Sequence, residues 1–227
     1  MQRLSPCSDE LVCGLLAAFI SDPKRILDVG CGRGERMKAL STTFPQAKLF
    51  GVDADADMVK AASSVAEVFH ASAEELPFGD ESFPLALCEC SLSLFTDAEK
   101  ALAEMARVLE KGGFLLVGEL FASLDGKDYV SAPDGETIGK IYSGSMIEAM
   151  AKSAGFEMLS FSDRGEDLAA MAAQIPMILT RRAVLTFRFS AINRSANRDA
   201  KAKAATISMQ TSTKPRFSFS WVSSSCM

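Results

Sequence analysis

The sequence has little of what marks several classes of protein. Its 227 residues include one histidine, one tryptophan and two tyrosines, and no apolar run is long enough to cross a bilayer. The short run Leu11–Ile20 follows two acidic residues and lacks a cleavage site of small residues, so we do not expect a signal peptide. A net charge of −5 excludes a general basic field that would recruit nucleic acid.

The cysteines do not form a recognisable framework. Their spacings match neither a set of disulfides nor a zinc site, and the six are Cys7, Cys13, Cys31, Cys88, Cys90 and Cys226. Free thiols are typical of a reducing compartment. We therefore expect a soluble, cytoplasmic protein without a metal.

Charge and composition divide the chain unevenly. From residue 190 to the end, six basic residues face one acid and nine serines occur, whereas the preceding residues carry a net charge of −10. We predict one domain over 1–189 and a serine-rich, basic, disordered tail over 190–227. The alternative for the tail is a basic arm that binds an acidic partner or nucleic acid.

Strand and helix patterns alternate through the predicted domain. Short apolar runs predict strands at 25–29, 47–52, 65–69, 85–88, 114–117, 156–161 and 183–189. Helical patterns lie between or beside them, at 8–20, 35–44, 55–64, 98–109, 145–154 and 167–175. This alternation predicts an α/β fold with a Rossmann-like, doubly wound, mostly parallel sheet and helices on both faces. A ligand of such a sheet lies outside the carboxyl ends of the strands.

Two predicted helices begin at a capping box, a serine or threonine followed three residues later by glutamate. The pairs are Thr96 with Glu99 and Ser145 with Glu148. We expect the glycines at 112–113 to end the first of these helices.

A glycine-rich loop follows the first predicted strand. The stretch Asp28-Val-Gly-Cys-Gly-Arg-Gly34 opens a helix, and its glycines let a ligand approach the backbone N–H groups closely. The third glycine comes one residue earlier than in the dinucleotide fingerprint, and Glu35 would face a pyrophosphate, which disfavours a dehydrogenase. Asp28 is placed to receive a ligand ammonium. Asp53 ends the second strand, where it can accept hydrogen bonds from both ribose hydroxyls.

A ligand with an ammonium and a ribose but no phosphate is S-adenosylmethionine. Over about 24–119 the sequence resembles the class I S-adenosylmethionine-dependent methyltransferases, of the small-molecule "type 11" branch. The glycine loop, Ala73-Glu-Glu-Leu-Pro-Phe78 and Arg107-Val-Leu-Glu-Lys-Gly-Gly113 carry the resemblance. It implies S-adenosylmethionine as cofactor, bound by Asp28, Gly30, Cys31, Gly32, Gly34, Asp53, Ala54, Met58, Ser72, Ala73 and Cys88. Ser72 stands where the family usually has an aspartate.

Methyl transfer needs alignment of the nucleophile more than it needs acid–base chemistry. Glu89, at the carboxyl end of the 85–88 strand, is our first candidate for a catalytic base or a substrate-orienting group. The alternative is a carboxylate that caps a turn. Glu119 is a weaker candidate, with a solvated charge at the rim as the alternative. His70, the only histidine, is expected to be structural or to flank the cofactor, with a general base as the alternative.

A further hypothesis concerns the thiols. Cys31, Cys88 and Cys90 could gather at one rim and bind a soft substrate such as a trivalent metalloid. Against this, buried cysteine is a common small core residue.

Two segments could close the site. We expect the helix over 8–20 to cap the cofactor, with packing on the sheet edge as the alternative. The irregular stretch 120–142 contains Tyr129 and Tyr142 and is expected to be a substrate loop.

The leading interpretation is a methyltransferase for a small-molecule acceptor, with no membrane partner and nucleic acid disfavoured. The alternative is a non-catalytic S-adenosylmethionine-binding sensor or scaffold.

Overall fold

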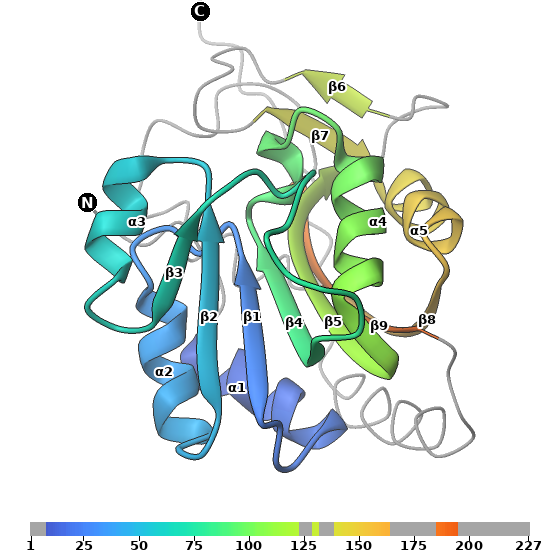
Figure 1. The fold of residues 1–227 in the computed structure, drawn as a ribbon. Coiled ribbons are helices and arrows are strands. Elements are labelled where there is room, and N and C mark those ends of the chain that lie inside the picture. The colour runs from blue at the N-terminus through green and yellow to red at the C-terminus, as the bar shows by residue number, and fades with distance from the viewer. Residues whose placement is uncertain (1–7, 123–128, 132–138, 164–184, 195–227) are drawn as a thin grey trace, which may run out of the picture.

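A computed structural model describes residues 8–122, 129–131, 139–163 and 185–194 of the chain (Figure 1). The helices are α1 (Asp9–Phe19), α2 (Glu35–Thr43), α3 (Ala56–Ala62), α4 (Ala98–Val108) and α5 (Gly144–Ser153), with a 3-10 turn η1 (Leu92–Leu94). The strands are β1 (Arg25–Val29), β2 (Lys48–Asp53), β3 (Glu67–His70), β4 (Phe83–Glu89), β5 (Leu109–Ala122), β6 (Tyr129–Ser131), β7 (Lys140–Ser143), β8 (Phe156–Asp163) and β9 (Leu185–Arg194). Among these helices, none has both the length and the apolar character that a membrane span requires.

The described strands form one sheet in the order β3-β2-β1-β4-β5-β7-β6, and β9 joins β5 to β8. The five strands from β3 to β5 are all parallel to their neighbours, whereas β9 runs antiparallel to both of its partners. Figure 1 shows helices on both faces of the sheet. The prediction of a doubly wound, mostly parallel α/β fold is confirmed.

Each face of the sheet has its own hydrophobic core, because successive side chains of a strand point to opposite faces. Leu27 and Ala86 belong to the core beneath α4 and α5. Their neighbours Ile26 and Leu85 belong to the core beneath α1 and α2. The central strands are therefore buried on both sides, as their continuous apolar runs predict.

Helix α4 begins at Ala98 as predicted, but its N-cap is one residue later than the capping box places it. Asp97 is the N-cap, and its carboxylate accepts the backbone N–H of Lys100 at 3.0 Å. The capping box at Thr96 is therefore wrong. Ala98 is buried in the core, and the carboxylate directly before it takes the capping position.

The end of α4 also differs from the prediction. Leu109 is already extended and pairs with Phe83, so that β5 begins directly after the helix. The glycines at 112–113 therefore lie inside β5 and do not end the helix. In α5, the N-cap is Ser143, whose hydroxyl accepts the N–H of Met146 at 3.1 Å, and the predicted capping box at Ser145 is wrong. Burial of Leu109 and Ser143 against the core sets these boundaries.

Strand β5 is long enough to pair with three strands. Its residues 114–122 pair with β9 along one edge. Along its other edge it pairs with β4 as far as Gly118, and β7 continues there at Phe121–Ala122 because β9 occupies the first edge. The β6–β7 pair therefore lies beyond the carboxyl end of β4 (Figure 1). It forms part of the predicted substrate loop, of which 123–128 and 132–138 lie outside the described residues.

The last strand reaches further than predicted. β9 continues to Arg194, which pairs with Phe156, so that residues 190–194 belong to the sheet and not to the predicted tail. The predicted boundary at residue 189 is moved because β5 and β8 both offer unpaired backbone groups to this segment. The remainder of the tail and the helix predicted at 167–175 lie outside the described residues.

Replacing Asp97 with alanine should lower the free energy of unfolding by about 1 kcal/mol, because a backbone N–H at the start of α4 loses its acceptor. Thr96→Ala is the matched control, since it changes the preceding residue and leaves the cap in place. Equilibrium urea denaturation followed by circular dichroism measures both. A larger loss in Thr96→Ala than in Asp97→Ala would restore the capping box at Thr96.

Candidate functional site

The loop between β1 and α2 lies at the carboxyl ends of the central strands. Its three glycines have positive φ angles, 75° at Gly30, 53° at Gly32 and 77° at Gly34. The N–H groups of Gly30 and Cys31 both donate to the carbonyl of Val52, at 2.8 and 3.0 Å. These bonds fix the loop to the end of β2.

Two of these glycines are required for different reasons. A Cβ on Gly30 would collide with the side chain of Ser91, whose hydroxyl lies 3.1 Å from the Gly30 carbonyl oxygen and donates to it. Gly30 therefore lets the loop pack closely on the turn after β4. At Gly32, no heavy atom lies within 4 Å of the position of a Cβ. Open space beside a backbone of positive φ allows a ligand to approach closely.

Asp53 is held beside this open space. Its Oδ2 accepts the N–H of Gly32 at 2.8 Å, and its Oδ1 accepts the N–H of Asp55 at 2.9 Å. A carboxylate offers roughly four acceptor positions, so each oxygen can accept one further donor. The half-buried carboxylate is thus oriented by the backbone and retains the capacity to accept two hydroxyl groups.

The residues predicted to lie along the rest of the cofactor occupy the rim between β2 and α4. Ala54 is exposed, Met58 is half-buried, and His70 donates from Nε2 to the carbonyl of Ala54 at 2.9 Å. Ala73 is buried. Asp28 is buried within β1, where its register partners are Gly51 and Leu87.

Ser72 is linked to a carboxylate that the sequence analysis missed. Its hydroxyl donates to Glu74, whose other carboxylate oxygen accepts the N–H of Asp97 at 3.0 Å. Burial raises the pKa of Glu74, but the hydrogen bonds from Ser72 and the backbone outweigh it and hold that pKa below its ordinary value. Glu74 therefore places a carboxylate next to the Ser72 hydroxyl, where the family's aspartate at position 72 would place its own.

The thiols do not gather as the metalloid hypothesis requires. Cys88 lies in the core beneath α4, whereas Cys31 and Cys90 pack in the core on the opposite face of the sheet. Cys90 has a φ of 53°, so the segment from Cys88 is not extended and the two side chains do not share a face. Burial, with added repulsion from nearby carboxylates, raises the pKa of Cys31 and of Cys88. Because the sheet separates Cys88 from Cys31 and Cys90, the three thiols do not form one set of ligands, and the hypothesis is wrong.

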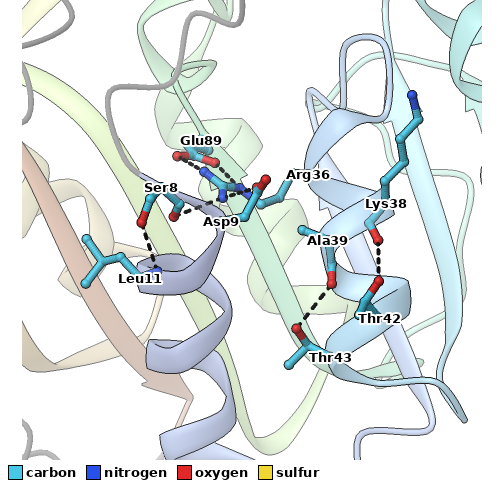
Figure 2. Close-up of polar contacts among 9 residues, drawn as sticks. All are labelled: Ser8, Asp9, Leu11, Arg36, Lys38, Ala39, Thr42, Thr43 and Glu89. Atoms are coloured by element: carbon cyan, nitrogen blue, oxygen red, sulfur yellow. Dashed lines mark hydrogen bonds and ion pairs between the residues drawn. The ribbon is translucent and has the colours of Figure 1, made fainter.

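Glu89 does not stand alone at the end of β4. Its Oε2 accepts from Nε of Arg36 at 2.8 Å and its Oε1 accepts from Nη2 at 2.7 Å, which makes a bidentate pair (Figure 2). Nη1 of Arg36 also donates to Oδ1 of Asp9 at 2.7 Å and to the carbonyl of Ser8 at 3.3 Å. Because both of its carboxylate oxygens already accept hydrogen bonds from the guanidinium, Glu89 is poorly placed to take a proton from a substrate.

Glu119 is buried, which rules out a solvated charge at the rim. Only 2% of the residue is exposed. Its Oε2 accepts the N–H of Ser93 in η1 at 3.0 Å, and its Oε1 accepts the N–H of Leu120 at 2.8 Å. Burial raises its pKa to about 7, against the lowering effect of these hydrogen bonds. Glu119 therefore anchors η1 at the carboxyl ends of β4 and β5.

The two tyrosines have different environments. Tyr142 is buried in the core beneath α4 and α5. Tyr129 is 47% exposed, and the centroids of the two rings lie 6.0 Å apart. Leu94, in η1, is similarly exposed at 48%. Within the described segments, no group of three or more His, Cys, Asp and Glu side chains could hold a metal ion.

The sequence analysis missed the roles of Arg36, Asp9 and Ser91. An arginine in the first turn of a helix is electrostatically unfavourable, and this was the one signal that Arg36 has a special environment. Its partners are 27 and 53 residues away in the sequence, so only the tertiary structure identifies them.

Replacing Glu119 with glutamine should change how stability depends on pH. The native pKa of about 7 lies above the ordinary value of 4.5, so the buried charge costs nothing below about pH 4.5 and costs its full amount above about pH 7. Relative to wild type, Glu119→Gln should therefore gain on the order of 3 kcal/mol between about pH 5 and about pH 8.

Urea denaturation at the two pH values measures this gain. Glu110→Gln is the control, since Glu110 is an exposed carboxylate on the same strand and its loss should leave the pH dependence unchanged. An equal pH dependence in Glu119→Gln and wild type would mean that Glu119 is already charged well below neutral pH.

Comparison with known proteins agrees with this geometry. The "Methyltransferase domain" family matches residues 27–117. The chain is 37% identical over 109 residues to the uncharacterized methyltransferase YcgJ of Bacillus subtilis, a match that covers 44% of this chain and 42% of that protein. It is 30% identical over 158 residues to the O-methyltransferase rstn1 of Aspergillus nomiae, a match that covers 62% of this chain and 67% of that protein. The chain thus spans less than half of the first relative and about two thirds of the second.

Solved structures share the fold at low sequence identity. The [4+2]-cyclase SpnF has a TM-score of 0.65 at 21% identity, over 83% of this chain and 81% of that one. A geranyl diphosphate C-methyltransferase from Streptomyces coelicolor, solved with S-adenosyl-L-homocysteine, has a TM-score of 0.68 at 14% identity, over 82% and 80% of the two chains. These structures show the fold alone, whereas the sequence matches show the family: the chain belongs to the S-adenosylmethionine-dependent methyltransferases.

Proposed function

We propose that this chain binds S-adenosylmethionine and transfers its methyl group to a small-molecule acceptor at the carboxyl ends of β4 and β5. One observation carries the proposal. Asp53 is oriented by the N–H of Gly32 and keeps acceptor capacity for two hydroxyls, beside a backbone with open space above it. A ribose that presents two adjacent hydroxyls fits this arrangement.

The chain's own residues would hold the cofactor along this rim. The loop from Gly30 to Gly34, with Cys31 and Gly32, would contact its methionine end, together with the buried charge of Asp28. Ala54 and Met58 would flank its base on one side, and Ser72, Ala73 and the Glu74 carboxylate would lie on the other. When bound, the cofactor supplies a methyl group on a positively charged sulfur, which a nucleophile can attack directly.

Alignment and exclusion of water are the tasks left to the protein. Support for Glu89 as a base is weak, because Arg36 binds both of its oxygens. We assign Glu89 a positioning role at the end of β4. Cys88 contributes to this rim through its backbone, since its side chain is fully buried in the core.

The acceptor side is apolar. Leu94 in η1 and Tyr129 in β6 are the large hydrophobic side chains that the described residues leave exposed, and both belong to elements beyond the carboxyl ends of β4 and β5. Glu119 fixes η1 by accepting the N–H of Ser93. An acceptor with an apolar face would be bound between these elements. A nucleic-acid acceptor is disfavoured by the net charge of −5.

Calorimetric titration of S-adenosylmethionine into the full chain tests the proposal. Asp53→Asn should raise the Kd about tenfold or more, because a charge-assisted hydrogen bond to a ribose hydroxyl is worth about 1.5–3 kcal/mol. Asp57→Asn is the matched control, since it removes an exposed carboxylate nearby on α3 and should leave the Kd unchanged.

Absence of binding by the folded wild-type chain would overturn the proposal. Binding without formation of S-adenosylhomocysteine across a panel of apolar hydroxyl, amine and thiol acceptors would favour the alternative of a non-catalytic sensor or scaffold. The same fold in a protein named as a cyclase shows that the fold does not by itself dictate methyl transfer.

A further inference from the structure

Arg36 is a buried cation in an unfavourable place. It lies in the first turn of α2, two residues after Gly34, and only 5% of its side chain is exposed. The backbone N–H groups at a helix start repel a positive charge, and removal of a guanidinium from water is costly. Its position must therefore be stabilised by specific partners.

Those partners come from two other segments of the chain (Figure 2). Glu89, at the end of β4, accepts hydrogen bonds from Nε and Nη2 of the guanidinium. At the start of α1, the Asp9 carboxylate and the Ser8 carbonyl both accept from Nη1. Burial lowers the pKa of Arg36, but its hydrogen bond with Glu89 and the carboxylate charges outweigh this effect and raise the pKa, so the group stays charged. Arg36 thus joins the ends of β4 and α1 beside the glycine loop.

The two carboxylates differ in how strongly they are bound. The Glu89 side chain is 9% exposed and forms a bidentate pair, so its separation from Arg36 would leave a buried charge without its partner. The Asp9 side chain is 46% exposed, and water can replace its contact with Nη1 of Arg36 at little cost. The Arg36–Glu89 pair is therefore the fixed half of the network, and the Asp9 contact is the half that can open.

The start of α1 can separate without unfolding the helix. Its buried side chains Val12, Leu16 and Phe19 lie further along and hold the helix to the core. Ser8 caps the first turn, accepting the N–H of Leu11 at 3.2 Å, so Ser8 and Asp9 move together with that turn. A small displacement of this turn would open the edge next to the loop.

We propose that Arg36 is a positioning residue that controls retention of the cofactor, by holding the first turn of α1 through Asp9 against the edge formed by the glycine loop and Glu89. This inference rests on the proposed function. Coupling between two sites is reciprocal, so the bound cofactor must stabilise the Asp9 contact as much as the contact stabilises the bound cofactor.

The test is a comparison of Asp9→Ala with Glu10→Ala in the full chain. Both variants remove an acidic residue from the first turn of α1, but it is Asp9 that accepts the hydrogen bond from Arg36. Asp9→Ala should raise the Kd for S-adenosylhomocysteine about fivefold or more, within the usual range of coupling between sites. Glu10→Ala should leave the Kd unchanged, and Asp9→Glu, which keeps the carboxylate, should restore most of the affinity.

Two further readouts separate this role from a structural one. The ligand-free thermal midpoints of Asp9→Ala and Glu10→Ala should be alike, because the Asp9 side chain is 46% exposed and Arg36 keeps its bidentate pair with Glu89 in both variants. Saturating S-adenosylhomocysteine should slow hydrogen exchange of the α1 amides in wild type and in Glu10→Ala. In Asp9→Ala the ligand should not slow this exchange.

The outcomes are distinguishable from those of the proposed function. If the wild-type chain binds no S-adenosylhomocysteine, the proposed function and this inference both fail. If wild type binds and Asp9→Ala matches Glu10→Ala in affinity and exchange, the proposed function stands and the role of Arg36 is wrong.

Discussion

The site depends on the parallel pairing of β1 with both β2 and β4. Parallel strands end at the same edge, so this pairing brings Asp53 and Glu89 to either side of the glycine loop although they are distant in sequence. The carbonyl of Val52 then accepts the N–H groups of Gly30 and Cys31, which turns the chain sharply away from the sheet. Positive φ angles at the glycines make that turn possible.

The chemistry of each carboxylate at this edge depends on the groups that surround it and not on its residue type alone. Asp53, Glu89 and Glu119 are three carboxylates at or near strand ends, yet each has a different environment. Asp53 is half-buried and held by backbone N–H groups, Glu89 is bound by a guanidinium, and Glu119 is fully buried with backbone donors. Their chemistry differs accordingly: the first can accept further donors, the second has both oxygens engaged by a guanidinium, and burial raises the pKa of the third to about 7.

Two segments that are distant in sequence lie beside the edge of the sheet that holds the glycine loop. α1 approaches the glycine loop through Asp9 and Arg36, whereas the β6–β7 pair extends the edge of β5 beyond the end of β4. The first contact is electrostatic and partly exposed, and the second is a backbone pairing. The two segments are thus held to the edge by different kinds of interaction.

The sequence by itself determined the order of strands and helices from α1 to β5, the parallel sheet and the position of the loop at residues 28–34, because periodicity and glycine placement are local properties. It missed the strands β6 and β7, which lie in the stretch 120–142 that it predicts to be irregular. It also determined the family, since the motifs occur at the right spacing. It misplaced the N-cap of α4, the start of α5, the end of α4 and the reach of β9, because burial of Ala98, Ser143 and Leu109, and the pairing of β9, depend on distant partners. Only the tertiary structure decided that the thiols are separated by the sheet, that Glu119 is buried and that Glu89 is bound to Arg36. Those facts depend on which side chains meet across the fold, and a single sequence does not record such contacts.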